Sequence, residues 1–321
     1  MLTREATDVD RGGGISPNPH MDRGKAILAR HPQIRTLIGR NPGTAAWIAL
    51  TWTIQMGLAA TAATMPWWVI LPLAYFLGAF VALALWALLH ECTHDLVFRR
   101  RLHNRMLGLA AATPLVLPVA APFRKYHRLH HRHQGDPARD ADVASRWECR
   151  LVGSNPVAKA FWLALGPVLQ AVRPMRMKGV SLFDRDFVAN CILQAVFIAA
   201  VASVLGGGAI AYLLLANCFS LGLHPLGART IQEHFTFADG QETYSYYGPT
   251  NMFVFNAGFH VEHHDLIGVP WNRLPQVAAM APELYAGLHS HRSWSGLLVR
   301  FLFDPEITLE SRVVRQREKI A

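Results

Sequence analysis

Three long stretches of the chain carry no charged side chain. Residues 45–65 and 66–89 contain no Asp, Glu, Lys or Arg, and neither does the stretch 187–223. Each of the first two is about long enough to cross a hydrocarbon layer of about 30 Å as a helix. The third is too long for one span, and we expect it to divide at Gly206-Gly207-Gly208. The pattern therefore predicts four transmembrane helices, at about residues 45–65, 66–89, 187–205 and 209–223.

Two further apolar segments do not fit a simple span. Residues 106–122 include Pro114, Pro118 and Pro122, and proline breaks a spanning helix unless neighbouring groups compensate. We therefore interpret this segment as re-entrant or interfacial. Residues 155–172 are apolar around Lys159, and we expect them to lie on the surface.

The first part of the chain is polar. Residues 1–43 show no charged start followed by an apolar stretch and a cleavage site, so no cleaved signal peptide is predicted. Within them, residues 22–40 are typical of a short basic amphipathic helix at a membrane surface. We expect residues 44–315 to form one membrane domain, followed by a short tail, 316–321.

Composition supports a membrane protein. Hydrophobic residues make up 51% of the 321 residues and charged residues only 17%, below the roughly 25% of soluble domains. The net charge is +9, yet no Lys or Arg lies between residues 41 and 98 or between 186 and 228. With four spans, all basic residues share one side, which the positive-inside rule makes cytoplasmic together with both termini. We attribute the charge to the membrane and not to nucleic acid, and the Ala- and Arg-rich composition indicates a bacterial inner membrane.

Histidine, with 16 residues, is unusual in number and in arrangement. Residues three and four apart share one face of a helix, so each cluster can direct its rings to one place. Imidazole is a ligand for Fe, Zn, Cu and Ni, and eight rings are too many for one four-coordinate zinc. They suit two metal ions that keep open positions. The three clusters are His90 with His94, then His127, His130 and His131, then His260, His263 and His264.

Other polar residues flank these clusters. We favour His234 as a ninth ligand, with His224 as the alternative, since both follow the last span. Metal-bound imidazoles commonly donate their other N–H to a carboxylate or carbonyl. Candidates for such support are Glu91, Asp95, Glu233, Glu262, Asp265 and the acidic run Asp136, Asp140 and Asp142, and Asn256 could face the site through water. The histidines without a partner at ligand spacing are interpreted as solvated or interfacial: His20, His31, His103, His289 and His291.

Different classes of function remain open at this point. His90-Glu91-x-x-His94 matches the HExxH motif of zinc proteases, in which Glu91 would be the general base. That interpretation leaves both HxxHH clusters unused. A metal transporter or sensor would place its ligands near mid-span, whereas these clusters begin at span ends. Histidines without any metal role do not explain three clusters on one side of the membrane.

The spacing HxxxH, HxxHH and HxxHH around two pairs of spans resembles the membrane fatty acid desaturase and hydroxylase superfamily. Within it, the chain is similar to the sphingolipid Δ4-desaturases, also called dihydroceramide desaturases. The resemblance covers roughly residues 18–315. It is carried by the histidine clusters and by Pro19–Arg23, Gly222–Pro225, Glu233-His234, Glu242–Pro249, Phe255-Asn256, Glu262–Asp265 and the closing segment Asp304–Arg312.

The resemblance implies a fold and a reaction. The fold is an all-α integral membrane protein with four transmembrane helices and a cytosolic, histidine-rich helical cap. The reaction is an O2-dependent desaturation of a membrane lipid, at C4–C5 of a dihydroceramide-type sphingolipid. Electrons would come from a separate cytochrome b5-type or ferredoxin partner, because the chain has no HPGG haem motif. A lipid hydroxylase, acting on sphingolipid C4 or on a carotenoid, is the alternative. The implied ligands of two irons are His90, His94, His127, His130, His131, His234, His260, His263 and His264.

Overall fold

The computed structural model describes residues 19–178 and 181–315, so part of the polar N-terminal segment and the tail 316–321 lie outside the described residues. The described chain is mostly helical, and its two short strands form one parallel pair. The longer helices are α1 (Pro19–Arg30), α2 (Thr44–Ala62), α4 (Ala79–Thr93), α5 (Arg101–Ala112), α6 (Ala120–His133), α10 (Arg185–Leu205), α11 (Gly207–Leu221) and α16 (Trp294–Phe303). The shorter elements are η1 (Pro32–Leu37), α3 (Trp67–Leu73), η2 (Ala74–Gly78), η3 (Thr113–Leu115), α7 (Arg146–Val152), α8 (Pro156–Ala164), α9 (Gly166–Val172), η4 (Arg173–Arg176), η5 (Pro225–Ala228), α12 (Arg229–His234), β1 (Ser245–Tyr246), η6 (Pro249–Met252), α13 (His260–Asp265), η7 (Trp271–Arg273), α14 (Leu274–Met280), α15 (Pro282–Tyr285) and β2 (Ser290–His291).

Three continuous helical stretches among the described residues are long and apolar enough to cross a membrane: Trp67–Thr93, Arg185–Leu205 and Gly207–His234. They overlap three of the four expected spans. The remaining one, 45–65, forms α2, which is uncharged but is not among the three. It is less apolar because it includes Gln55 and four threonines. The chain breaks between α10 and α11 at Gly206, whose positive φ of 84° suits glycine.

The proline-containing segment forms a sharp bend. The helical stretch Arg101–Leu115, made of α5 and η3, meets α6 at an angle of 111°. Pro114 and Pro118 lie in or next to η3, where the missing N–H groups prevent a continuous helix. The bend directs α6, with its histidine cluster, toward the end of α4. This break agrees with the expectation that residues 106–122 do not form a simple span.

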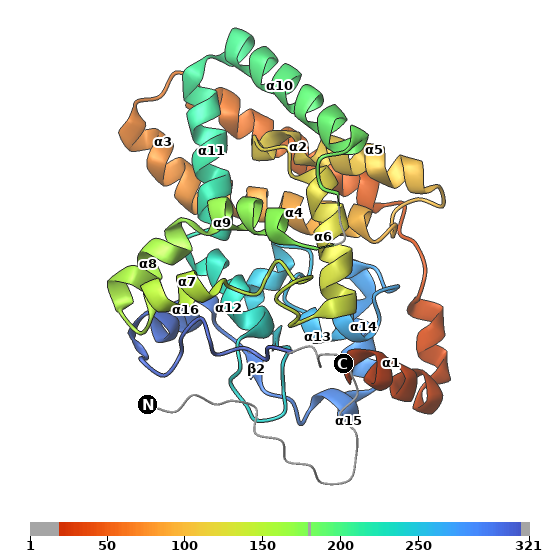
Figure 1. Ribbon diagram of the computed structural model, residues 1–321. Helices are drawn as coiled ribbons and strands as arrows, with labels where there is room; N and C mark the ends of the chain where they lie inside the picture. Colours follow the sequence, from red (N-terminus) through yellow and green to blue (C-terminus); the bar gives the residue numbers. More distant parts are fainter. Residues whose placement is uncertain (1–18, 179–180, 316–321) are drawn as a thin grey trace.

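Helix α4 lies at the centre of the molecule. It packs against α2, α5, α6 and α11, and its Leu83, Leu85, Leu88 and Leu89 are almost fully buried. Figure 1 shows α2, α3, α5, α10 and α11 in the upper half of the view and α1, α12, α13 and α14 in the lower half, with α4 and α6 between them. The apolar helices are thus separated from a polar, irregular half, and α4 and α6 join the two.

Two segments expected at a surface also pack against other parts of the protein. The expected amphipathic helix at residues 22–40 forms α1 and η1, but Ile27 and Ile34 are fully buried against the region of α13. One side of this segment therefore packs against protein, while Met21 and Ile38 stay exposed. Residues 155–172 lie at the surface as expected, since Phe161 and Val168 are each more than half exposed. Lys159 itself is fully buried, and its ammonium group donates to the carbonyls of Phe301 (2.9 Å) and Asp304 (2.8 Å) at the end of α16.

Candidate metal centre

Four helices bring the histidines together. His90 lies in the last turn of α4 and His94 follows that helix directly. Helix α6 carries the second cluster, α13 carries the third, and His234 is the last residue of α12. The i, i+3, i+4 spacing of each cluster puts its rings on one helix face, and the bend before α6 turns these faces toward one another. The structure thus gathers residues that lie up to 174 positions apart, between His90 and His264.

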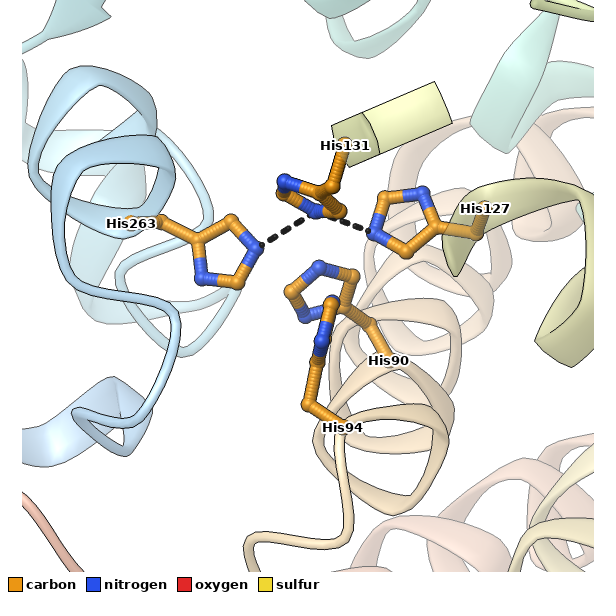
Figure 2. Close-up of side chains that lie close together, drawn as sticks. All are labelled: His90, His94, His127, His131 and His263. Atoms are coloured by element: carbon orange, nitrogen blue, oxygen red, sulfur yellow. Dashed lines mark hydrogen bonds between the residues drawn. The ribbon is translucent and has the colours of Figure 1, made fainter. Parts of the chain in front are cut away.

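Five rings form the first group. Figure 2 shows His131 above, His127 and His263 facing each other from the right and the left, and His90 and His94 below, around a common space. One nitrogen of each ring lies within 4.8 Å of one nitrogen of every other ring. The Nε2 atom of His131 lies 3.0 Å from that of His127 and 3.1 Å from that of His263. We call these five residues the first histidine group.

Four rings form the second group, next to the first. In His130, His234 and His264, one nitrogen of each ring lies within 4.8 Å of one nitrogen of the other two. The Nε2 atom of His234 lies 3.0 Å from those of His130 and His260, which brings His260 into the second histidine group. The two groups touch, since the ring centroids of His131 and His264 are 4.2 Å apart.

The nitrogen spacing fits metal ligands. Two imidazole nitrogens each about 2.1 Å from one ion and at right angles to each other are about 3 Å apart. Among the described residues, Nε2 of His94 and Nε2 of His264 are buried without any hydrogen-bond partner, a costly state that a metal ion would relieve. Burial lowers the pKa of His263 to about 3, so its ring is neutral, the form that binds metal. The donor set therefore fits two transition-metal ions.

Outer contacts hold several rings in place. Nδ1 of His130 lies 2.9 Å from Asp140 and 3.4 Å from Asp142. This is the carboxylate–histidine arrangement that orients a metal ligand. Nδ1 of His234 faces the Gln134 side-chain amide at 3.2 Å. Gln134 is a contact that spacing along the sequence gave no reason to expect.

The flanking acids divide by what they touch. Glu233 lies 3.6 Å from Nδ1 of His260 and forms an ion pair with Arg229. Glu91 is 3.9 Å from Nδ1 of His90, and its carboxylate accepts the backbone N–H of Trp271 at 3.2 Å. These two acids lie beside the rings.

Three other polar residues have different partners. Within the described part of the chain, Asp95 contacts no ring and instead binds Arg124 at 2.7 Å and Arg128 at 2.6 Å on α6. Its expected support of an imidazole is therefore wrong, and it joins the end of α4 to α6. Glu262 accepts the hydroxyl groups of Ser245 and Tyr247, and burial raises its pKa to about 7. The Asn256 amide donates to the Trp271 carbonyl at 3.1 Å.

Two histidines expected to be solvated are buried. His20 lies 2.6 Å from Asp265 and 2.7 Å from the Thr243 hydroxyl group, and His291 packs against Phe237. Their partners are distant in sequence or apolar, so spacing alone gave no signal. His224, the alternative ninth ligand, lies away from both groups: its Nδ1 atom accepts the backbone N–H of Leu226, and its ring packs on Tyr75.

One cavity reaches both histidine groups. It has a volume of about 90 Å³ and is lined by His90, His127 and His263 of the first group and by His130 and His260 of the second. Apolar side chains, among them Leu83 and Phe123, line it together with polar ones. A second cavity of about 200 Å³, almost entirely apolar, adjoins it and shares the lining residues Trp86, Tyr126, Gln170 and Leu221.

Comparison with known proteins gives two family matches. Residues 66–295 match the profile of the fatty acid desaturase family, and residues 16–43 match that of the sphingolipid Delta4-desaturase family. Sphingolipid delta(4)-desaturase DES1 of Drosophila melanogaster is 37% identical over 306 residues, covering 94% of both chains. A DES1-like protein of Arabidopsis thaliana is 38% identical, over 94% of this chain and 90% of its own.

A third relative has a second activity in its name. Human sphingolipid delta(4)-desaturase/C4-monooxygenase DES2 is 36% identical over 92% of both chains. The relatives named here are eukaryotic, so they give no support to the bacterial membrane expected from the composition.

Proposed function

The chain belongs to the fatty acid desaturase family, and on this premise we propose that it is an O2-dependent, di-iron sphingolipid desaturase. The proposed reaction removes one hydrogen each from C4 and C5 of a dihydroceramide-type lipid and leaves a trans double bond. The observation that carries the proposal is that rings of both histidine groups line one and the same cavity. A lipid carbon in this cavity would lie next to both metal positions.

In this proposal the first histidine group would hold one iron and the second would hold the other. Bound iron supplies the oxidant, derived from O2, that an unactivated C–H bond requires. The electrons balance because O2 takes two from the lipid and two from a separate donor, with protons, to give two water molecules. Asp140 holds His130 in the orientation in which its Nε2 atom faces the site. HExxH protease chemistry is disfavoured, because His90 and His94 lie with three further rings and Glu91 is engaged by Trp271.

The adjoining apolar cavity suits the alkyl chain of the lipid. It lies among α6, α9, α10 and α11 and includes Phe187 and Leu182. Phe183, another of its lining residues, is 62% exposed at the outer surface. An alkyl chain of the lipid lying in this cavity would pass Trp86 and Tyr126 to reach the histidine groups. Holding the chain in this way fixes which carbon meets the metal ions.

Polar groups beside the rings favour a bond close to the lipid headgroup. Gln170, Arg229, Glu233 and Asn256 line the same cavity as the histidines. A sphingoid base carries its hydroxyl and amide groups on carbons 1 to 3, so C4 is adjacent to a polar carbon. These side chains can hydrogen-bond that headgroup while C4 and C5 face the metal positions. Desaturation in the middle of a fatty acyl chain would call for an apolar lining here.

Hydroxylation at C4 is the second candidate function. It is favoured by the relatives of rat and human, both named as desaturase/C4-monooxygenase and 35% and 36% identical to this chain. Both outcomes begin with loss of one hydrogen from the alkyl chain. They differ in whether a second hydrogen is lost or an oxygen atom is added.

We place the histidine groups, the two termini and the docking of the electron donor on the cytoplasmic side of the membrane. All 31 Lys and Arg residues lie in the three segments on this side, outside 41–98 and 186–228. The donor is proposed as a cytochrome b5-type protein or a ferredoxin. The histidine-rich half of the molecule would then form a helical cap on the membrane domain.

The test is mass spectrometry of lipids from cells that express the full chain with an electron donor and are fed a dihydroceramide. We expect a product two hydrogens lighter. His263→Ala, which removes a ring of the first group, should abolish the product. His103→Ala, an exposed histidine of α5, is the matched control and should retain it.

The other outcomes are equally informative. A product one oxygen atom heavier would make the protein a hydroxylase with the same site. A change in another lipid class, with ceramides unchanged, would contradict the sphingolipid substrate. Full activity of His263→Ala would contradict the ligand assignment.

A further inference from the structure

A cavity of about 330 Å³ lies between α4, α5, α6 and α10, and none of the nine histidines of the metal centre lines it. It borders a different face of α4, at Leu89, Cys92 and Thr93, from the face that carries His90 and His94. Its volume is at the low end of the roughly 300–1,000 Å³ typical of small-molecule sites. The proposed reaction makes no use of this space.

The lining of this cavity is strongly basic. Five cationic side chains face it, Arg101, Arg105, Arg124, Lys125 and Arg128, against one carboxylate, Asp186. The side chains that line the cavity therefore carry a net charge of +4, from five cations and one carboxylate. Arginine is well suited to phosphate, because its planar guanidinium group can donate two parallel hydrogen bonds. The lining thus favours an anionic ligand.

The nearby acids leave part of this charge uncompensated. Asp95 is shared by three guanidinium groups, those of Arg124 (2.7 Å), Arg128 (2.6 Å) and Arg101 (3.9 Å). Arg101 is 84% exposed, so its long contact with Asp95 leaves most of its donors free for another acceptor. Arg105 is paired with Asp186 and Lys125 with Asp184, but each of these four side chains is at least 21% exposed.

Apart from Thr93 and Asn104, the uncharged part of the lining is apolar or small, and part of it lies on membrane helices. Leu89 belongs to the helical stretch Trp67–Thr93 and Ala189 to Arg185–Leu205, two of the three stretches that can cross a membrane. Leu109, Ala120 and Ala121 continue this apolar wall. Arg101 and Arg105 lie in the first turns of α5, close to the end of α4. The cavity therefore combines a basic rim with an apolar wall, at the end of the membrane helices where the basic residues of the chain gather.

We propose that this cavity is a binding site for an anionic phospholipid. The phosphate would accept hydrogen bonds from Arg101 and Arg105, and the start of an acyl chain would lie along Leu89, Leu109 and Ala189. Basic pockets between membrane helices on the cytoplasmic side are suited to such headgroups. A lipid here would join α5, α6 and α10 next to the bend that positions the second histidine cluster. The site is independent of the substrate cavity and of the proposed reaction.

The test uses the full chain purified in a neutral detergent with equal amounts of phosphatidylglycerol and phosphatidylcholine. Native mass spectrometry counts the bound lipids, and thermal unfolding measures the protection that each gives. We expect one phosphatidylglycerol to bind in preference to phosphatidylcholine and to raise the unfolding temperature. The double variant Arg101→Gln/Arg105→Gln should bind it about 25-fold more weakly, since each basic side chain near an anionic surface contributes about fivefold.

The matched control is Arg99→Gln/Arg100→Gln, which removes the same charge from two exposed neighbours that do not line the cavity. It should keep near-normal binding. Equal loss in both double variants would overturn the site in favour of general surface charge. Protection by inorganic phosphate alone, equal to that given by the lipid, would overturn the lipid assignment. Neither readout requires desaturase activity, so failure of this site is distinguishable from failure of the proposed function.

Discussion

Nδ1 of His20, in the first turn of α1, lies 2.6 Å from a carboxylate oxygen of Asp265, the last residue of α13. Nε2 of the same ring lies 2.7 Å from the Thr243 hydroxyl group, which is itself 3.4 Å from Nδ1 of His234. The N-terminal helix is thus connected to α13, which carries His264, and through Thr243 to His234, and both histidines belong to the second histidine group. Residues 16–43 match the profile of the sphingolipid Delta4-desaturases, and we propose that this segment supports the candidate metal centre through Asp265 and Thr243.

Replacing His20 with Ala should weaken the metal centre. The change leaves the buried Asp265 with fewer donors, which costs about 1–3 kcal/mol. We expect a lower unfolding temperature and faster loss of iron to a chelator from the purified protein. His31→Ala is the control, because His31 lies in the same segment but pairs with the half-exposed Glu283. Equal rates of iron loss from both variants would contradict this support.

The close approach of α1 to α13 gives a second test. A Cβ atom on Gly24 would lie 2.3 Å from the backbone carbonyl oxygen of Asp265, so Gly24→Ala must push the two helices apart. Overpacking of this kind costs about 1–3 kcal/mol, and thermal unfolding should show it. Gly57→Ala in α2 is the matched control, because nothing lies within 4 Å of its added Cβ. It should be neutral or stabilising, by up to about 1 kcal/mol. Similar losses in both variants would rule out α1 docking as the cause.

The division of the histidines into two groups predicts metal stoichiometry. His94→Ala affects only the first group and His234→Ala only the second. If each group holds one iron as proposed, the wild type should contain about two and each purified variant about one. Elemental analysis of folded protein measures this ratio. His224→Ala is the control that separates the two candidates for the ninth ligand, since His224 lies in neither group. Loss of iron from His224→Ala, with normal content in His234→Ala, would reverse the assignment.

The contact between His130 and Asp140 predicts weaker metal binding in Asp140→Asn. Removing a carboxylate that orients a metal-binding histidine typically lowers metal affinity 10- to 100-fold. Competition with a chelator of known affinity would measure the change. Asp136→Asn is the control, because Asp136 lies in the same acidic run but its carboxylate accepts the Ala138 backbone N–H. Unchanged affinity in Asp140→Asn would show that His130 needs no carboxylate partner.

Local patterns in the sequence predicted the helices and the faces on which histidines share a helix, because both depend on residues a few positions apart. Which rings meet could not be predicted in this way. His130 and His131 are neighbours in the chain yet belong to different groups, since adjacent residues on a helix point in different directions. The partner of His20 lies 245 residues away. Likewise, Asp95 contacts arginines because the bend before α6 brings them to the end of α4, and Lys159 is buried because α16 covers it.

The ion pair between Glu148 and Arg173, which lies outside the membrane helices, predicts how the stability of the protein depends on pH. Glu148 lies in α7, is almost fully buried, and pairs with Arg173. Burial by itself raises its pKa, but the hydrogen bond and charge of Arg173 outweigh this effect and lower the pKa from 4.5 to about 2. A carboxylate whose pKa is lowered in the folded state stabilises the fold at pH values above its pKa in the unfolded chain. This stabilisation is lost as the pH falls toward the folded-state pKa.

The wild type should lose about 2 kcal/mol from this group between pH 5 and pH 3. Glu148→Gln should be less stable at pH 7 by up to about 3 kcal/mol, and the gap to the wild type should narrow in acid. Unfolding midpoints across this range measure the gap. Glu306→Gln, at an exposed position, should follow the wild type throughout, and a constant gap for Glu148→Gln at every pH would show that the carboxylate is not the ionised partner of Arg173.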